Sequence, residues 1–430
     1  MPSSSELVAR YERVRERSLG LCAPVSAEDA QVQTMAEASP AKWHLAHTSW
    51  FFEQFVLAPL GEAPMHPNYG FLFNSYYEAV GARVERARRG LVTRPTFGEV
   101  LAYRREIDGR VAHALVEGLE SRARDLLSIV ELGIAHEEQH QELILTDLKH
   151  VLGTQQLRPA YRENLARTSS RSRVTPLSFA ELGGGVLEIG AAEAGFAYDC
   201  EKPRHRVIVE PFRLATRLLS NAEVIAFIAD GGYRDARLWL SDGWALVQQD
   251  ELSAPLYWEQ RDSAWWHYTL GGMREVVPAE TACHLSYFEA DAIARWAGAR
   301  LPTEVEWEIA ASEVVRARER EGALVAEGNF VETDRLHPAA ASGDGDGMRQ
   351  LFGDVWEWTA SAFAPYPGYR PLPGALGEYN GKFMASQQVM RGGSCFTPRA
   401  HIRASYRNFF PPSARWQMTG VRLAADGGRS

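Results

Sequence analysis

The sequence predicts an α+β protein with two domains, a bundle of four helices over residues 1–165 and a loop-rich domain of short strands over residues 166–430. Three observations lead to this prediction. A chain of 430 residues is too long for one ordinary hydrophobic core. Apolar residues recur at helical spacing through the first third of the chain. The composition changes from Pro159 onward, where glycine pairs begin to separate short β-like segments.

The first domain is predicted from four segments in which apolar residues follow a helical period. They cover residues 6–21, 39–60, a stretch from Thr96 to about Glu120, and residues 125–151, which Gly153 is expected to end. Thr96-Phe-Gly-Glu99 has the pattern of a capping box at the start of its helix. Because the connections are short, the segments favour a helical bundle.

The second domain is predicted to contain few regular elements. A polar segment at residues 167–173 is typical of a linker, and the β-like runs beyond it include HRVIVEPF at residues 205–212. Only residues 221–230 and 286–299 have patterns that predict helices. No internal repeat is visible.

Composition and charge exclude several classes of function. Apolar residues make up 45% and charged residues 23% of the chain, an ordinary folded profile. The net charge of −9 and the absence of a basic stripe argue against a nucleic-acid partner. The chain shows neither a membrane-spanning apolar run nor a hydrophobic leader, so a cytoplasmic protein is expected. The sequence does not indicate an oligomeric state. Four widely separated cysteines argue against a disulfide framework and a cysteine-based zinc site: Cys22, Cys200, Cys283 and Cys395.

The sharpest local signal is His136-Glu-Glu-Gln-His140. Two histidines four residues apart lie one turn apart on the same helical face, as two ligands of one metal require. That face is expected to turn inward, where the imidazoles need partners. His47 lies on the inward face of an earlier helix, so three imidazoles from two helices would cap a metal. Core histidines bonded to carbonyls are the alternative. His44 is expected to point away from His47, toward solvent or behind the ligands.

The residue types alone leave the metal open. HEEQH contains the zinc metalloprotease signature H-E-x-x-H, in which Glu137 would be the general base and Glu163 the third ligand. A neutral three-histidine cap with open positions instead suits iron(II), although most non-haem iron oxygenases use two histidines and a carboxylate. A zinc-dependent hydrolase or thiol transferase, and a non-catalytic ligand-binding protein, therefore stay open as alternatives.

Motifs in both halves of the chain together resemble one known family. WHLAHTSWFFE at residues 43–53, NSYY at 74–77 and HEEQHQEL at 136–143 resemble the DinB-like bundle of ergothioneine-biosynthesis sulfoxide synthases. Four further motifs resemble the formylglycine-generating-enzyme fold, a C-type-lectin-like core: RLPTEVEWE at 300–308, GDVWEWT at 353–359, RGGS at 391–394 and GVRL at 420–423. Each fold alone is widespread, but their union in this order is specific and covers nearly the whole chain.

The resemblance implies an iron(II) enzyme that joins hercynine (Nα-trimethylhistidine) to a cysteine-type thiol with dioxygen, giving hercynylcysteine sulfoxide. It identifies His47, His136 and His140 as the ligands of Fe(2+). Coordination would lower the pKa of the thiol, and holding both reactants on one metal would bring them together. Related ovothiol synthases carry an additional methyltransferase domain, for which this chain is too short.

The resemblance also implies the residues that bind the substrates. Gln139 matches the glutamine that orients the bound imidazole, and Arg86 and Arg89 match a pair that grips the carboxylate of the thiol donor. The plain interpretation of this arginine cluster is a solvated loop. A segment with two aromatic rings matches the part that holds the quaternary ammonium group: Asn408, Phe409 and Phe410. Aromatic faces suit a cation that has no hydrogen-bond donors, although core packing would equally explain these rings.

Two adjacent tyrosines bear on the identity of the thiol donor. The family requires a phenol near the iron, and in one subtype the tyrosine comes from the C-terminal domain. Phe363 stands where that tyrosine is expected, so Tyr77, with Tyr76 beside it, is predicted to be the active phenol. Packing is the alternative role for such a pair. The subtype with paired tyrosines in the first domain uses free cysteine, which we expect here, with γ-glutamylcysteine as the alternative.

Other motifs are expected to be structural. Residues 354–358 (DVWEW) are predicted to build the second core and to shape the wall of a cleft. Formylglycine-generating chemistry itself is not expected, because its copper site needs a close cysteine pair. Cys283 and Cys395 are far apart in the sequence, although the fold could bring them together.

Overall fold

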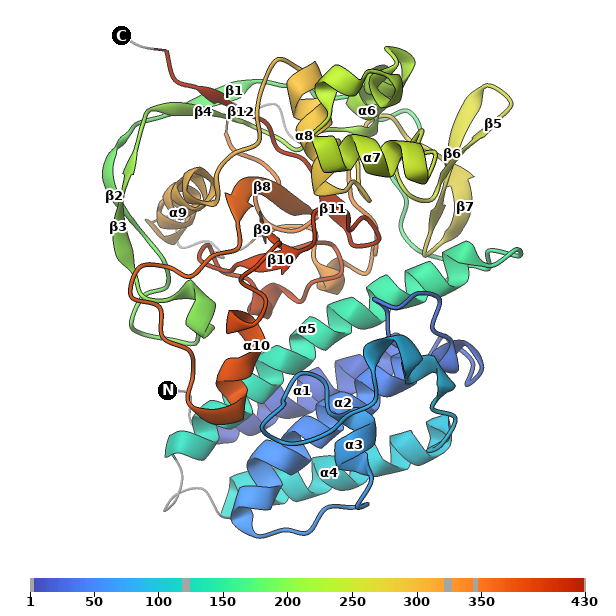
Figure 1. Cartoon of the computed structure of the whole chain (residues 1–430), viewed down its shortest axis with the longest axis vertical. Coiled ribbons are helices and arrows are strands. Elements are labelled where there is room, and N and C mark those ends of the chain that lie inside the picture. The colour runs from blue at the N-terminus through green and yellow to red at the C-terminus, as the bar shows by residue number, and fades with distance from the viewer. Residues whose placement is uncertain (1–3, 118–123, 321–326, 343–346, 429–430) are drawn as a thin grey trace. The chain divides into compact units, whose positions relative to one another are not determined.

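The structure, a computed structural model, describes residues 4–117, 124–320, 327–342 and 347–428. The chain divides into two units, one mainly helical and one of mixed helices and sheets (Figure 1). The first unit contains Met1–Arg162 together with two short segments from later in the chain, Ala194–Phe196 and Leu372–Tyr379. The second unit contains the remaining residues. The predicted two-domain α+β fold is thus confirmed.

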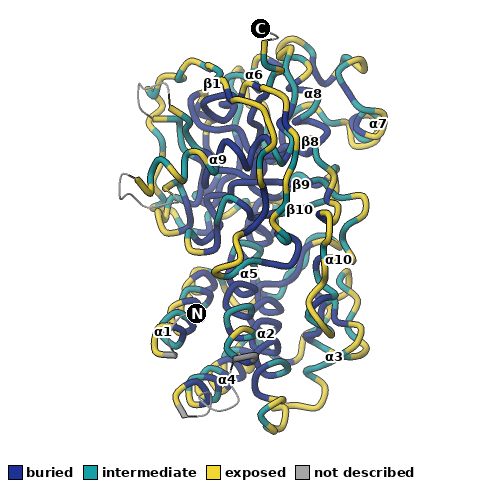
Figure 2. The backbone as a smooth tube through the Cα atoms, turned by 90° about the vertical axis from the view of Figure 1, so that its left-hand side faces the viewer, coloured by how far each residue is buried: buried dark blue, intermediate teal, exposed yellow. Residues whose placement is uncertain are grey.

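Four long helices build the first unit. Its helices are α1 (Ser4–Cys22), α2 (Ala41–Phe52), the short α3 (Tyr69–Phe73), α4 (Phe97–Glu117) and α5 (Arg124–Thr154). Helix α2 packs against α4 and α5, while α1 packs against the same two helices (Figure 1). Every residue of α2 is buried, so this helix forms the centre of the bundle (Figure 2).

The helix ends follow local chemistry, with one correction. The predicted capping box is present, since the Glu99 N–H donates to Thr96 Oγ1 at 3.3 Å and the Thr96 N–H donates to the Glu99 carboxylate at 2.7 Å. The predicted end of α5 at residue 151 is wrong, because the helix continues through Gly153 to Thr154. There the Thr154 hydroxyl donates to the His150 carbonyl at 2.7 Å, which satisfies a terminal acceptor. The predicted end of α4 near Glu120 lies outside the described residues.

Short strands in four small sheets build the second unit. The strands are β1 (Phe179–Leu182), β2 (Gly185–Ile189), β3 (His205–Val209), β4 (Phe212–Ala215), β5 (Trp258–Arg261), β6 (Ala264–Thr269), β7 (Gly272–Glu275), β8 (Trp356–Ala362), β9 (Gln388–Arg391), β10 (Asn408–Phe410), β11 (Thr419–Gly420) and β12 (Ala424–Asp426). They pair in the orders β1-β4-β12, β10-β9-β8-β11, β2-β3 and β5-β6-β7. The HRVIV run forms β3 as predicted and pairs antiparallel with β2.

The second unit holds more helices than the sequence pattern predicted. Its helices are α6 (Asn221–Ala229), α7 (Ser241–Gln249), α8 (Tyr287–Trp296) and α9 (Glu304–Arg320), and α10 (Glu378–Gly381) lies where the two units meet in the sequence. The two predicted helices are α6 and α8. The expectation of only two helices was wrong. The start of α9 is marked in the sequence by a capping box. The Glu306 N–H donates to Thr303 Oγ1 at 3.2 Å and its carboxylate accepts the Thr303 N–H, a capping box.

The DVWEW motif lies in the core of the second unit, as predicted. Trp356 and Trp358 are fully buried on β8, on either side of the buried Glu357. The carboxylate of Glu357 accepts from Trp307 Nε1 and from Arg422 Nε, each at 2.8 Å. These bonds compensate the buried charge, so the motif provides both packing and a satisfied polar network.

Candidate metal centre

Three histidines from two helices of the first unit converge. His47 on α2 and His136 and His140 on α5 offer ring nitrogens that all lie within 4.8 Å of one another, and all three side chains are buried. His47 Nε2 and His136 Nε2 are 3.2 Å apart. The predicted grouping of these residues is therefore present in the fold.

The remaining ring nitrogens show which atoms are available to a metal. His47 Nδ1 lies 2.6 Å from the carbonyl oxygen of Phe73, which can only accept, so this nitrogen carries the hydrogen. His140 Nδ1 lies 2.7 Å from Nδ1 of His44. With their Nδ1 atoms engaged, His47 and His140 direct Nε2 toward the shared space. His136 Nδ1 is buried without a hydrogen-bond partner among the described residues.

Burial keeps the three imidazoles neutral. It lowers the pKa of His136 to about 4, and it lowers the pKa values of His47 and His140 well below their ordinary value, with the neighbouring histidines adding to the effect. Neutral imidazoles with converging lone pairs fit a divalent cation, which would satisfy them together. Imidazole ligands suit iron, zinc and copper, so the donor set does not select among these metals.

A glycine allows the two ligand helices to approach. A Cβ atom at Gly133 would lie 2.6 Å from a ring carbon of Phe52 and 2.9 Å from one of Phe51. Both phenylalanines belong to α2, so α5 lies against α2 at this point only because residue 133 has no side chain. His136 follows within one turn, and this close packing brings it to His47 on the facing helix.

A tryptophan stacks on His47, and an arginine packs on that tryptophan. The indole of Trp43 stacks on the His47 imidazole, with ring centres 4.6 Å apart and an angle of 10° between planes. The guanidinium of Arg89 lies 3.4 Å from the centre of the Trp43 ring. The indole N–H of Trp43 donates to the Leu72 carbonyl at 3.1 Å, which fixes the ring between the two. His47 is thus held on both its ring face and its Nδ1.

Glu137 does not face the histidines as a general base would. Its buried carboxylate accepts from Arg15 Nη1 at 2.7 Å, from Ser18 Oγ at 2.6 Å and from Arg104. Burial alone would raise its pKa, but the guanidiniums of Arg104 and Arg15 and the Ser18 hydroxyl lower it to about 2. A carboxylate held this way is a poor proton acceptor near neutral pH.

A histidine stands third in the described group, where a zinc metalloprotease was expected to use Glu163. Glu163 is exposed and belongs to the second unit, and the residue that gathers with His136 and His140 is His47. The carboxylate of Glu137 is bound by arginines, and His47 supplies the third ring nitrogen, which together argue against the metalloprotease interpretation.

The two tyrosines occupy different environments. Tyr77 is buried, and its ring lies 5.0 Å from Phe55 and 5.9 Å from Trp50 between ring centres. Burial raises the pKa of Tyr77, so its phenol is protonated at neutral pH. Tyr76 is half-buried, and its hydroxyl accepts from Arg86 Nη1 at 3.1 Å.

Residues 372–379 contact the loop that follows Tyr76 and Tyr77. No role for this segment was predicted from the sequence. The Glu378 carboxylate accepts from the backbone N–H groups of Glu78 and Ala79, each at 3.0 Å. The Tyr379 ring lies 6.0 Å from that of Tyr76. Both residues belong to the segment that clusters with the helical unit. A separation of 300 residues explains why the sequence held no signal for this contact.

The arginine cluster is not a solvated loop throughout. Arg89 is buried and donates to Ser39 Oγ at 2.9 Å and to Ser75 Oγ at 3.1 Å. Burial and the nearby Arg86 charge lower the pKa of Arg89 to about 9. Within the described part of the chain, neither Arg86 nor Arg89 has a carboxylate oxygen within 4 Å. Two neighbouring cations without an anion are suited to bind one.

The other predicted substrate residues belong to two different units. Gln139 is half-buried on α5, between the two ligand histidines of that helix. The predicted aromatic segment is strand β10 of the second unit, and its three residues are half-buried. Phe409 stacks on Phe363 with ring centres 4.1 Å apart, and Phe410 meets Trp416 edge-on at 5.9 Å. Part of each ring therefore serves packing.

Comparison with known proteins places the chain in a family. Residues 10–144 match the DinB superfamily, and residues 166–427 match the Sulfatase-modifying factor enzyme 1-like domain. The chain is 32% identical to "Hercynine oxygenase" of Mycolicibacterium thermoresistibile, over 99% of its own length and 96% of that protein. It is 33% identical to the protein of the same name from Mycobacterium tuberculosis, over 99% and 100%. The chain belongs to the hercynine oxygenase family. The resemblance inferred from the motifs is thereby confirmed.

Membership of the hercynine oxygenase family accounts for both halves of the chain. The second half alone is 29% identical to "Formylglycine-generating enzyme" of Streptomyces coelicolor, over 57% of this chain and 88% of that protein. All four cysteines of this chain are buried and free. Among the described residues, no helix is both long and apolar enough to cross a membrane.

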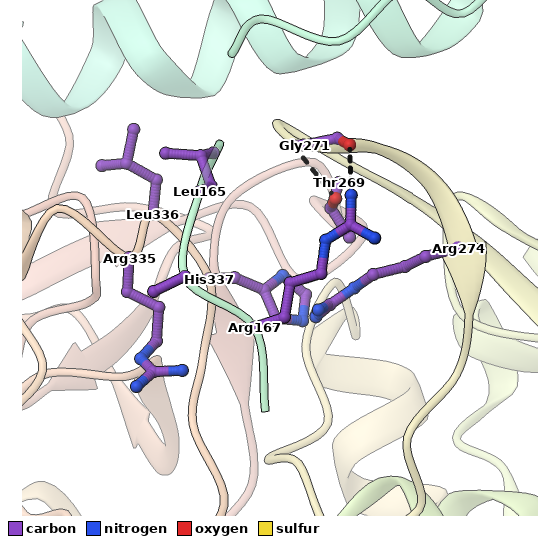
Figure 3. A pocket seen from close by; sticks show the side chains of 9 residues that line it. Leu165, Arg167, Thr269, Gly271, Arg274, Arg335, Leu336 and His337 are labelled. Carbon is purple, nitrogen blue, oxygen red and sulfur yellow. Dashed lines mark hydrogen bonds between the residues drawn. The ribbon is translucent and has the colours of Figure 1, made fainter. Parts of the chain in front are cut away.

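A second histidine–carboxylate group lies in the other unit of this hercynine oxygenase family member. His267, Glu280 and His337 are buried with ligand atoms within 4.8 Å of one another. The Arg274 guanidinium lies among them, donating to both Glu280 oxygens at 2.9 Å and lying 3.3 Å from His267 Nε2. Figure 3 shows this guanidinium beside the His337 ring, at the wall of a small pocket. The carboxylate of this group is therefore already paired with a cation.

Proposed function

We propose that this chain is an iron(II) enzyme that joins hercynine to cysteine with dioxygen and gives hercynylcysteine sulfoxide. The observation that carries the proposal is the buried three-histidine group in a chain of the hercynine oxygenase family. A metal site is the feature that an oxygenase needs, because dioxygen reacts slowly with closed-shell substrates unless a redox-active group takes part. The name of the relatives points to hercynine as one substrate.

The residues present fit the proposed metal. Fe(2+) would be held by ring nitrogens of His47, His136 and His140. Because these imidazoles are neutral, the ion would keep its full positive charge and would attract anionic ligands. Iron bound there would supply dioxygen activation and would favour the thiolate form of a bound thiol. Gln139, one position before His140, is proposed to orient the imidazole of hercynine.

Arg86 and Arg89 are proposed to bind the carboxylate of the thiol donor. The pKa of Arg89 is lowered by burial and by the neighbouring charge of Arg86, which is the situation that an added anion relieves. A guanidinium presents parallel N–H groups that match a carboxylate in two bonds. The stack of Arg89 on Trp43 links this anion site to His47, so the carboxylate would be bound close to the ligand histidines.

Separate roles are proposed for the two tyrosines of the first unit and for the aromatic segment of the second. Tyr77, with Tyr76 beside it, is proposed to supply a proton or hydrogen atom, and burial keeps the Tyr77 phenol protonated for this purpose. The trimethylammonium end of hercynine is proposed to meet the half-buried segment of Asn408, Phe409 and Phe410. The assignment of the phenol to the first unit is the reason to favour cysteine over γ-glutamylcysteine as the donor.

Oxygen uptake by the reconstituted protein tests the function. The protein is loaded with iron(II) without oxygen, and uptake is then followed with hercynine plus cysteine and, separately, with hercynine plus γ-glutamylcysteine. We expect uptake that needs both partners, yields a sulfoxide and is faster with cysteine. Absence of uptake with either thiol, together with tight binding of zinc, would reject the proposal in favour of a zinc-dependent hydrolase or thiol transferase.

A ligand variant ties the activity to the histidines. His136→Ala is expected to lose both iron binding and turnover, because it removes one of three converging nitrogens. His150→Phe is the matched control, since His150 lies further along the same helix and bonds Thr34 at 2.6 Å rather than the centre. Turnover that survives in His136→Ala would contradict the assignment of the site.

A further inference from the structure

A fourth histidine and an aspartate lie directly behind one of the ligand histidines. His44 Nδ1 lies 2.7 Å from His140 Nδ1, and His44 Nε2 lies 3.0 Å from Asp147 Oδ2. All three side chains are buried. The backbone N–H of Ser39 donates to the same Asp147 oxygen at 2.8 Å. His44 thus faces neither solvent nor the space that the three ligand histidines share.

The hydrogen positions in this chain of contacts follow from the donors and acceptors. The Ser39 N–H can only donate, so Asp147 Oδ2 is an acceptor and the hydrogen between Asp147 and His44 lies on His44 Nε2. The Nδ1 atom of a neutral His44 then accepts. Because the contact between the two Nδ1 atoms needs one hydrogen, that hydrogen lies on His140. The lone pair of His140 is therefore left on Nε2.

We propose that Asp147 and His44 form a positioning relay that fixes His140 in the tautomer whose Nε2 binds the metal. The inference deepens the proposed function and rests on it, since it assumes that the three histidines hold a metal. Metal-bound histidines usually donate their second N–H to a carboxylate or carbonyl, which sets both tautomer and ring angle. Here the imidazole of His44 lies between the carboxylate of Asp147 and His140, so the carboxylate sets the tautomer of His140 through His44.

Loss of the relay has a definite chemical consequence. Without Asp147, His44 is free to carry its hydrogen on Nδ1 and to donate it to His140 Nδ1. His140 would then carry its own hydrogen on Nε2, the atom that a metal needs. Without the His44 imidazole, the buried Nδ1–H of His140 loses its acceptor, which carries a desolvation penalty. Both changes act on the affinity for the metal rather than on contacts with substrate.

The contacts of Ser39 anchor the relay. Its backbone N–H holds Asp147 Oδ2, and its hydroxyl accepts from Arg89 Nη1 at 2.9 Å. Ser39 immediately precedes Pro40, at the start of α2, the helix that carries His44. One short segment therefore fixes the aspartate of α5 against the histidine of α2.

Metal affinity in the absence of substrates tests the relay. Iron(II), and cobalt(II) as a coloured substitute, are titrated without oxygen against a chromophoric chelator in four variants: His44→Phe, Asp147→Ala, Asp147→Asn and the control His150→Phe. We expect His44→Phe and Asp147→Ala to bind either metal roughly 10–100-fold more weakly. Asp147→Asn should stay closer to the wild-type affinity, because its amide oxygen can accept both hydrogens. The control should bind as the wild type does.

The outcomes separate this inference from the proposed function. Wild-type affinity in both His44→Phe and Asp147→Ala would overturn the relay while leaving the metal centre intact. Failure of the wild-type protein to bind either metal would overturn the metal centre itself. Should His44→Phe not fold, the comparison of Asp147→Ala with Asp147→Asn decides, and equal affinities of these two would also overturn the relay. The cobalt absorption spectrum adds a second readout. Loss of the relay should change the spectrum, because His140 would no longer offer Nε2, whereas a purely structural role would leave the ligand set and the spectrum unchanged.

Discussion

Replacing Glu137 with glutamine is expected to destabilise the bundle while leaving the metal ligands in place. Glu137 lies inside the HEEQH motif, yet its carboxylate accepts from Arg15 on α1 and from Arg104 on α4. It therefore joins α5 to two other helices on the side away from the metal ligands. Glutamine has the same shape, but it removes the negative charge that two buried guanidiniums share.

The size of the effect follows from the pKa of Glu137. Burial raises that pKa, but Arg104 and Arg15 lower it by more, so it falls from its ordinary value of 4.5 to about 2. Because a tenfold change in proton affinity corresponds to about 1.4 kcal/mol, the charged form contributes about 3 kcal/mol of stability at neutral pH. Removing one partner of a buried ion pair costs about 3–5 kcal/mol in other proteins, which agrees.

Urea denaturation of the metal-free protein at pH 7 measures this difference. Glu106→Gln is the control, because Glu106 is exposed on α4 and pairs with the partly exposed Arg110 one turn along the helix. We expect a loss of about 3 kcal/mol for Glu137→Gln and about 1 kcal/mol or less for the control. A pKa lowered in the folded state gives stability that is full above pH 4.5 and is lost as the pH falls toward 2. The two proteins should therefore converge in acid.

Two results would contradict this reasoning. A Glu137→Gln protein within about 1 kcal/mol of the wild type would show that the ion pairs of Glu137 contribute no more than exposed ones do. A variant of unchanged stability that binds iron but has lost all turnover would return Glu137 to the role of a general base. That outcome would also revive the comparison with zinc metalloproteases, in which the glutamate of H-E-x-x-H accepts a proton.

Three further changes test the surroundings of the centre. Gly133→Ala should weaken iron(II) binding and lower stability in urea, although alanine favours helices by about 1 kcal/mol, because its Cβ would lie 2.6 Å from the Phe52 ring. Tyr77→Phe should leave iron affinity unchanged but shift the products toward simple thiol oxidation, and an unchanged product ratio would remove Tyr77 from the reaction. Glu378→Ala should speed hydrogen exchange several-fold at Ala79 and less at Glu78, since it removes the carboxylate acceptor of both N–H groups while the Glu78 N–H keeps the Tyr76 carbonyl at 3.0 Å.

The inward-facing pair of His136 and His140 could be predicted because its signal is local. A spacing of four residues on one helix, with both side chains on the inward face, depends only on helical geometry. His47 required one further step, the assumption that two inward faces meet. The capping box of Thr96 and Glu99 was readable for the same reason, because both partners lie within four residues. Local chemistry therefore predicted both the helices and the grouped histidines of the first unit.

Contacts between distant segments could not be predicted in this way. The sequence showed Arg89 only as part of a basic cluster. Its burial could not be predicted, because it depends on Trp43, which lies 46 positions earlier in the chain. The acceptor that Glu378 provides for the tyrosine loop crosses 300 positions. Helix α9 is a different case, because its capping residues Thr303 and Glu306 lie within four positions and indicate the start of a helix from the sequence alone.

The charges around the three histidines explain why a motif shared with zinc metalloproteases can serve another chemistry. In those enzymes the glutamate between the histidines faces the metal and accepts a proton. Here Arg15 and Arg104 hold that glutamate elsewhere, so the three neutral histidines contribute no negative charge, and the carboxylate of Asp147 contacts His44 rather than the three grouped histidines. Arg86 and Arg89 add positive charge that no described carboxylate neutralises within 4 Å. A divalent cation in such surroundings favours anionic ligands. We infer that a thiolate that also carries a carboxylate meets both requirements at once, which favours a cysteine-type donor over a neutral nucleophile such as water.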